Sequence, residues 1–218
     1  MDSYAKGYLD GMVQAQLYVQ GFNFLKEMLP ADVVAEMQKV YPTDPNATTV
    51  LSPEGVYADY VLARQVTAIE RRKVLEMLGQ RGGMRLYTYD RSVTIPGVEN
   101  HSPLDYYNEM PYAFMNSRIN LNITLRSIRT GIPLRALDIM GSGGFLLSNY
   151  QQELLEYFEP DRDFVYYTDF EDLEQKVEYY LNHEEERAKI AENGCRKVRE
   201  QHSMRQRVQD IIAIVMGE

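Results

Sequence analysis

The sequence predicts an α/β fold, with a parallel sheet of about four or five strands, helices on both faces of the sheet and a helical segment in front. From residue 84 onward, short apolar runs alternate with helical patterns. This alternation indicates repeated β-α units and hence parallel strands. The earlier part of the chain has helical patterns only. The hydrophobic share of the 218 residues is 44%, as in folded globular proteins. From the alternation in the later part we expect a Rossmann-like domain that follows the helices.

The front of the chain is predicted to be a helical connector over residues 1–80, followed by the Rossmann-like domain over residues 81–218. Apolar positions recur at helical spacing in this front part. Pro30 is expected to stop the first helix, and Ser52 with Pro53 has the composition of a helix start. The expected helices cover residues 4–29, 33–41 and 52–79, the last with a break, and PTDPNATT (42–49) is expected to be a loop.

The rest of the chain carries the predicted strands and the helices that connect them. Alternating or continuous apolar residues predict strands over residues 84–90, 119–125, 145–150 and 163–169. Helical patterns cover residues 102–116, 133–140, 151–158, 170–182 and 183–202, and a last apolar helix runs to Met216.

Composition excludes several functional classes. The net charge is -9 and no long basic run occurs, which argues against nucleic acid or an anionic membrane as partner. No segment reaches the roughly 18 consecutive apolar residues of a membrane span. The single Cys195 cannot form an internal disulfide and suits a reducing compartment, so a cytoplasmic location is expected. Three His and one Cys, scattered along the chain, make no metal-ligand spacing.

The GSGG quartet at residues 141–144 resembles a phosphate-binding loop but is expected to lie at the wrong end of the sheet. Ligands of open parallel sheets bind outside the carboxyl ends of the strands. GSGG follows a helix and precedes a strand, which places it at the amino ends. We interpret it as a helix C-cap and a tight reversal.

The turn from Thr124 to Pro133 is the strand-to-helix connection and has the composition of an anion site. Pro133 is expected to be the first helical residue, which leaves the amides of Leu134 and Arg135 unpaired at the positive end of a helix dipole. Gly131 would let the backbone approach a ligand closely. An ordinary turn into a helix explains the same residues equally well.

Asp138 lies on the same predicted helix, three residues after Arg135. One helical turn is about 5.4 Å, so a pyrophosphate at the helix start would bring its ribose near Asp138. A carboxylate can accept hydrogen bonds from both ribose hydroxyls. The alternative is a partly exposed Asp138 paired with Arg135.

The stretch SRINLNITLRSIRTGIPLRALDIMGSGGFLLSNY, which begins at Ser117, carries a family resemblance. Together with the residues up to Gly194, it resembles the C-terminal domain of group 1, GT-B-type glycosyltransferases, nearest to the CgeB-like, spore-maturation subgroup. The resemblance covers about residues 84–205. Its pattern is Thr-Gly-Ile-Pro after a strand, Arg-x-x-acidic, Gly-x-Gly-Gly, and then Tyr at a strand end.

The resemblance implies a site for a nucleoside-diphosphate sugar, which would be the donor substrate, with no other cofactor and no metal. The acidic ribose-binding position falls on Asp138. An earlier Glu, eight residues upstream in relatives, is replaced here by Thr130. The Arg/Lys pair that relatives use on the pyrophosphate is not evident, so Arg126, Arg129 and Arg135 are candidate substitutes, and residues 101–106 would lie near the base. The predicted binding residues are Asn122, Arg129, Thr130, Gly131, Ile132, Arg135, Asp138 and His101.

The predicted function is therefore donor binding within a glycosyltransferase that transfers sugar to an unknown protein or glycan acceptor. The resemblance implies that an N-terminal acceptor domain is also needed, and no catalytic residue is assigned. The alternative is a non-catalytic Rossmann-like binding module, with a homo-oligomer formed through residues 1–80. A dinucleotide enzyme is a weaker option, because no G-x-G-x-x-G follows a strand.

Overall fold

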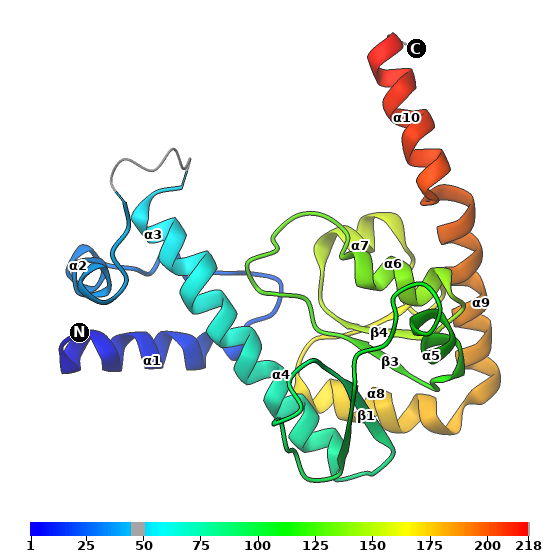
Figure 1. The fold of residues 1–218 in the computed structure, drawn as a ribbon, viewed down its shortest axis with the longest axis horizontal. Helices are drawn as coiled ribbons and strands as arrows, with labels where there is room; N and C mark the ends of the chain where they lie inside the picture. The colour runs from blue at the N-terminus through cyan, green and yellow to red at the C-terminus, as the bar shows by residue number, and fades with distance from the viewer. Residues whose placement is uncertain (45–50, 218) are drawn as a thin grey trace. The chain divides into compact units, whose positions relative to one another are not determined.

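The computed structural model describes residues 1–44 and 51–217 of the chain (Figure 1). Most of the predicted loop at 42–49 lies outside the described residues. The chain divides into two compact units. The helical unit comprises residues 1–84, 95–98 and 123–129, and the sheet unit comprises residues 85–94, 99–122 and 130–218.

The helical unit contains no strand before residue 84 within the part of the chain that the structure describes, as predicted. Its helices are α1 (Ser3–Leu17), α2 (Ala31–Val40), α3 (Pro53–Val56), the π-helical segment η1 (Tyr57–Leu62) and α4 (Ala63–Gly79). Apolar faces of these helices form one buried core, which includes Leu9, Val13, Leu25, Val33, Met37, Tyr57, Leu62 and Val66. Burial of these faces stabilises helices whose own sequence preferences are modest.

The prediction of one helix over residues 4–29 was wrong in its second half, because α1 ends at Leu17. The buried Gln16 explains the change. Its amide donates hydrogen bonds to the carbonyls of Val19 and Phe22, and its side-chain oxygen accepts from the N–H of Phe24. One side chain thus provides hydrogen-bond partners for three backbone groups of a non-helical loop. Gly21 turns the chain with φ +76°, a conformation that glycine adopts freely.

The helix predicted from Ser52 to Gly79 is confirmed, but the predicted break is not found, because α3, η1 and α4 follow one another without a gap. The Ser52 hydroxyl accepts the N–H of Gly55, and Pro53 is the first helical residue. The chain then stays helical to Gly79, with the π-helical segment η1 as the irregular part. A π-helical segment adds backbone without ending the helix, so the apolar face shifts around the axis.

The sheet unit confirms the predicted α/β class with parallel strands. Strands β3 (Asn120–Asn122), β4 (Leu146–Asn149) and β5 (Val165–Tyr167) form a parallel sheet in the order β3-β4-β5. The connections are α6 (Leu134–Gly141) and α7 (Gln152–Tyr157), and β5 is followed by α8 (Phe170–Asn182), α9 (Glu184–Gln201) and α10 (Met204–Met216). The carboxyl ends of all three strands therefore lie at one edge of this sheet.

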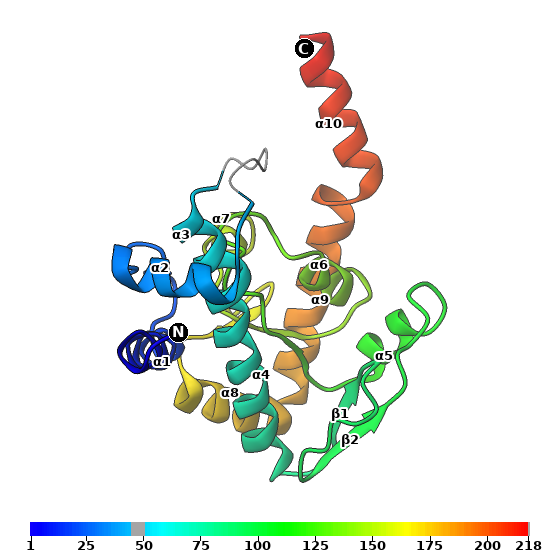
Figure 2. The ribbon, with the colours of Figure 1, turned by 60° about the vertical axis from the view of Figure 1, so that its left-hand side comes forward.

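Two further strands form a separate two-stranded sheet, β1 (Met84–Tyr87) with β2 (Val98–His101) (Figure 2). Arg85 pairs with Glu99, and the ring of Tyr87 stacks on that of His101, so the two strands run in the same direction. The sequence did not predict β2. The helix predicted over 102–116 was wrong in its first half, because only α5 (Met110–Asn116) is helical.

Helices α6, α7 and α9 pack with the three-stranded sheet around a second core. Its buried members are Ala136, Ile139, Met140, Leu146, Leu154, Phe158, Phe164 and Val198. On α8, the ring of Tyr180 lies against Phe145 at the start of β4. None of the helices within the described ranges is both long and apolar enough to cross a membrane.

Candidate functional site

The GSGG quartet lies where the sequence predicted, at the amino end of β4. α6 ends at Gly141, and Gly143 has φ +84° while its N–H bonds the carbonyl of Met140. The N–H of Gly144 bonds the carbonyl of Ile139, which closes the helix end in the manner of a Schellman motif. A Cβ on Gly144 would lie 2.7 Å from the side-chain nitrogen of Asn120. GSGG is thus a helix cap with close packing, as predicted, and not a ligand loop.

The start of α6 lies after the turn that leaves the carboxyl end of β3. Pro133 has φ -58° and ψ 127° and is the cap, so the first helical residue is Leu134, one position later than predicted. Within residues 1–44 and 51–217, the N–H groups of Leu134 and Arg135 have no hydrogen-bond partner. Two unpaired donors at a positive dipole end attract an anion.

Gly131 contributes differently from the prediction. Its φ is +91°, which a side chain would disfavour, and a Cβ there would meet no atom within 4 Å. However, its N–H donates to the carboxylate of Glu153, in the first turn of α7. The donors open to an incoming anion therefore begin at α6 itself and do not include Gly131.

Asp138 faces a small cavity on the inner part of α6. The cavity has a volume of about 140 Å³ and is lined by Tyr106, Tyr107, Met110, Pro111, Phe114, Asp138 and Ser142. The hydroxyl of Tyr106 donates to Oδ1 of Asp138 at 2.9 Å, and this bond raises the pKa of Tyr106 above its usual value. No ion pair joins Asp138 to Arg135 among the described residues, so the predicted alternative pairing is not found.

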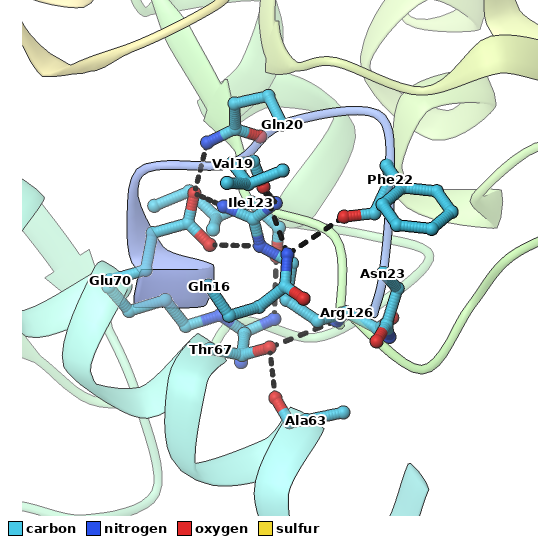
Figure 3. Close-up of polar contacts among 11 residues, drawn as sticks. Gln16, Val19, Gln20, Phe22, Asn23, Ala63, Thr67, Glu70, Ile123 and Arg126 are labelled. Carbon is cyan, nitrogen blue, oxygen red and sulfur yellow. Dashed lines mark hydrogen bonds and ion pairs between the residues drawn. The ribbon is translucent and has the colours of Figure 1, made fainter. Parts of the chain in front are cut away.

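The three candidate cations differ in their surroundings. Arg126 is almost fully buried and makes a two-bond pair with Glu70, at 3.0 and 3.1 Å, while its third nitrogen bonds the carbonyl of Val19 (Figure 3). Arg129 belongs to the helical unit and pairs with Asp59 at 3.2 Å. Arg135 is exposed, lies over the ring of Phe114, and has no acidic partner in the described part of the chain. Arg135 alone has a charge that is not already paired.

The remaining predicted residues do not gather around α6. Asn122 is buried, and its amide donates to the hydroxyl of Ser148 across the β3–β4 pair at 3.0 Å.

His101 stacks on Tyr87 and bonds Glu99, and the bond lowers the pKa of Glu99. Thr130 is exposed, and Ile132 packs against the second core. The structure thus brings Arg135 and Asp138 together with Tyr106.

Sequence reasoning placed Tyr106 in a stretch near the base but missed its contact with Asp138, and it missed Tyr107 and Glu153 as members of the site. Glu153 carried a usable signal, because an acidic residue in the first turn after β4 must lie at the same sheet edge as the turn after β3. The two tyrosines come from a segment whose irregular path no periodicity predicted. Within the described residues, no group of three or more His, Cys, Asp or Glu side chains could hold a metal ion.

Fold and site together define an α/β protein in which α6 begins after the carboxyl end of β3 and carries Asp138 on the wall of a cavity. The model of a family described as glycosyl transferase-like matches residues 64–213. Since the match covers well over half of the chain, the protein belongs to this glycosyl transferase-like family. The matched region begins in α4 and continues into α10, so it spans the complete three-stranded sheet. No curated protein matches the sequence.

Proposed function

We propose that this chain binds the nucleoside-diphosphate sugar of a glycosyltransferase and presents it for transfer to an acceptor. The single observation that carries the proposal is the arrangement on α6. Two unpaired amides open the helix, and one turn further along the carboxylate of Asp138 faces a cavity. A nucleoside diphosphate has an anionic group and a diol at a similar separation.

Each residue has a defined part in the proposed binding. The N–H groups of Leu134 and Arg135 donate to the diphosphate, and the guanidinium of Arg135 adds a positive charge. Asp138 accepts hydrogen bonds from the ribose hydroxyls. During transfer, the bond between the sugar's anomeric carbon and the diphosphate oxygen breaks, and negative charge grows on that oxygen. Fixed donors aimed at this charge lower the barrier.

The finer assignment is to the GT-B-type, CgeB-like members of the family. The order of a strand, Thr130-Gly131-Ile132-Pro133, Arg135, Asp138 and then Gly-x-Gly-Gly supports this assignment. In such a protein, the acceptor site and any general base would come from a second domain, because transfer occurs between two halves. The acceptor would be a protein or a glycan.

The test is titration calorimetry with uridine, guanosine and deoxythymidine diphosphates. We expect one of the three to bind, and Asp138→Ala to weaken its binding by about ten-fold, since about 1.4 kcal/mol corresponds to a factor of ten. Asp10→Ala, on the exposed side of α1, is the matched control and should bind like the wild type. Absence of binding by all three diphosphates would overturn the proposal.

A further inference from the structure

The carboxylate of Glu153 accepts the N–H of Gly131, and this contact joins two successive strand-to-helix turns. Gly131 lies in the turn after β3, and Glu153 is the second residue of α7, after β4. Because β3 and β4 are parallel neighbours with Asn122 opposite Ser148, both turns leave the sheet at the same edge. Both belong to the sheet unit.

The contact is a hydrogen-bond restraint on the last part of the turn, in addition to the packing of Ile132 against the second core. Among the residues that the structure describes, no other hydrogen bond is made by the backbone of residues 130–132. Gly131 has φ +91°, and the space above its α-carbon is open. A glycine in open space has wide conformational freedom, and its ordering costs more entropy than that of any other residue. Glu153 therefore limits motion immediately before the two amides that open α6.

A carboxylate at this position also carries an electrostatic cost. It brings a negative charge close to a site that we assign to a diphosphate, and like charges repel. A side chain whose only effect was its charge would weaken the site. A hydrogen-bond acceptor that holds the turn in place does the opposite, because a preorganised site loses less entropy on binding.

We propose that Glu153 is a positioning residue of the donor site, which holds the Gly131 turn so that the Leu134 and Arg135 amides point at the diphosphate. This inference rests on the proposed function. The acceptor oxygen does the positioning, and the negative charge is dispensable. A glutamine, which keeps the oxygen and removes the charge, should therefore preserve the site.

The experiment compares Glu153→Ala with Glu153→Gln in the full chain. The probe is whichever of uridine, guanosine and deoxythymidine diphosphate binds the wild type most tightly, together with the matching nucleoside. We expect Glu153→Ala to bind the diphosphate on the order of ten-fold more weakly and the nucleoside within two-fold of the wild type. Glu153→Gln should bind the diphosphate at least as tightly as the wild type. Glu156→Ala, also on α7 and exposed, is the control and should change neither affinity.

Several results would overturn the inference. Diphosphate binding by Glu153→Ala within two-fold of the wild type would show that the contact positions nothing. Equal weakening in the Ala and Gln variants would show that the charge matters, and tighter binding in both would show that Glu153 only competes with the ligand. Equal loss of nucleoside and diphosphate affinity would indicate general damage. If the wild type binds no diphosphate, the proposed function fails first, and that outcome is distinct from failure of the Glu153 variants alone.

Discussion

The hydroxyl group of Tyr106 donates a 2.9 Å hydrogen bond to Oδ1 of Asp138, the carboxylate that we assign to the ribose of the donor. The tyrosine hydroxyl thus stands where a ribose hydroxyl would stand in the proposed complex. The pKa of Tyr106 is raised, first by this bond and then by burial, so the phenol stays protonated at neutral pH and remains a donor. A diol that uses both carboxylate oxygens would compete with Tyr106 for Oδ1.

Replacement of Tyr106 by Phe removes this competitor. We expect Tyr106→Phe to bind the nucleoside diphosphate two- to ten-fold more tightly. A hydrogen bond to a charged group contributes about 1.5–3 kcal/mol, and in the wild type the ligand must offset part of this free energy when it replaces the Tyr106 hydroxyl. Titration calorimetry measures the change. Tyr89→Phe is the matched control and should bind like the wild type, since Tyr89 is 90% exposed and does not line the cavity. Weaker binding by Tyr106→Phe would show that the hydroxyl contacts the ligand itself.

The fold class followed from the sequence where local pattern and tertiary packing agree. Short, apolar-rich segments between helical patterns marked the strands, so the parallel sheet could be predicted, although β3 buries Asn120 and Asn122 and leaves Leu121 half-buried. The early end of α1 could not, because it depends on Gln16 finding three loop partners that lie beyond the helix. Periodicity reports which face is apolar, and it carries no information on where a polar side chain will find partners.

The site was partly predictable for a similar reason. Asp138 and the amides of Leu134 and Arg135 all lie on one short helix, so their spacing follows from helical geometry alone. Tyr106 and Glu153 approach from other segments, and their positions depend on tertiary structure. Arg126 was a candidate cation by sequence, yet the structure buries it and pairs its charge with Glu70. Spacing along the chain does not show which cation is buried and paired.

The pair of Arg126 and Glu70 allows a stability prediction for the helical unit. Glu70 is fully buried and Arg126 nearly so, and Thr67 accepts the N–H of Arg126 (Figure 3). We expect Glu70→Leu to cost about 3–5 kcal/mol of unfolding free energy, because it leaves a buried charge without its partner. The double variant Glu70→Leu with Arg126→Met should recover part of the loss. Denaturant unfolding followed by circular dichroism gives both values.

The control for this experiment is the exposed pair of Arg72 and Glu76, one turn apart on α4 with a 2.8 Å contact. Solvent screens such pairs, so Glu76→Ala should change the free energy of unfolding by less than about 1 kcal/mol. A cost for Glu70→Leu as small as that of Glu76→Ala would contradict the assigned role of the buried pair.

Two helical glycines should respond oppositely to alanine. A Cβ on Gly194 in α9 would lie 2.3 Å from the carbonyl oxygen of Asp163, so Gly194→Ala must separate α9 from that segment and should cost about 1–3 kcal/mol. A Cβ on Gly7 in α1 would meet nothing within 4 Å. Gly7→Ala should therefore stabilise the protein by about 0.5–1 kcal/mol, through helix propensity. Melting curves of both variants decide the matter, and destabilisation by Gly7→Ala would contradict the open surface described for α1.

His202 makes stability depend on pH. It is buried at the end of α9, stacks on Phe158, and accepts a hydrogen bond at Nδ1 from Arg207. Burial first, and then the positive charges of Arg207 and Lys197, lower its pKa in the folded protein. The unfolded chain, with a pKa near 6.5, then binds more protons than the folded chain in acid. The stability that neutral His202 provides is fully present above about pH 6.5 and is lost as the pH falls through the folded value.

We therefore expect the melting temperature of the wild type to fall between pH 7.5 and pH 5 by a few degrees more than that of His202→Gln, since about 1 kcal/mol corresponds to roughly 2–4 °C at this chain length. Glutamine cannot titrate in this range, so the difference between the two curves isolates the imidazole. His183→Gln is the control, because the ring of His183 is exposed and stacks on Tyr179 at the surface. It should follow the wild type at every pH. Parallel curves for the wild type and His202→Gln would show that the buried imidazole accepts a proton without cost, and that its contact with Arg207 does not depend on the neutral form.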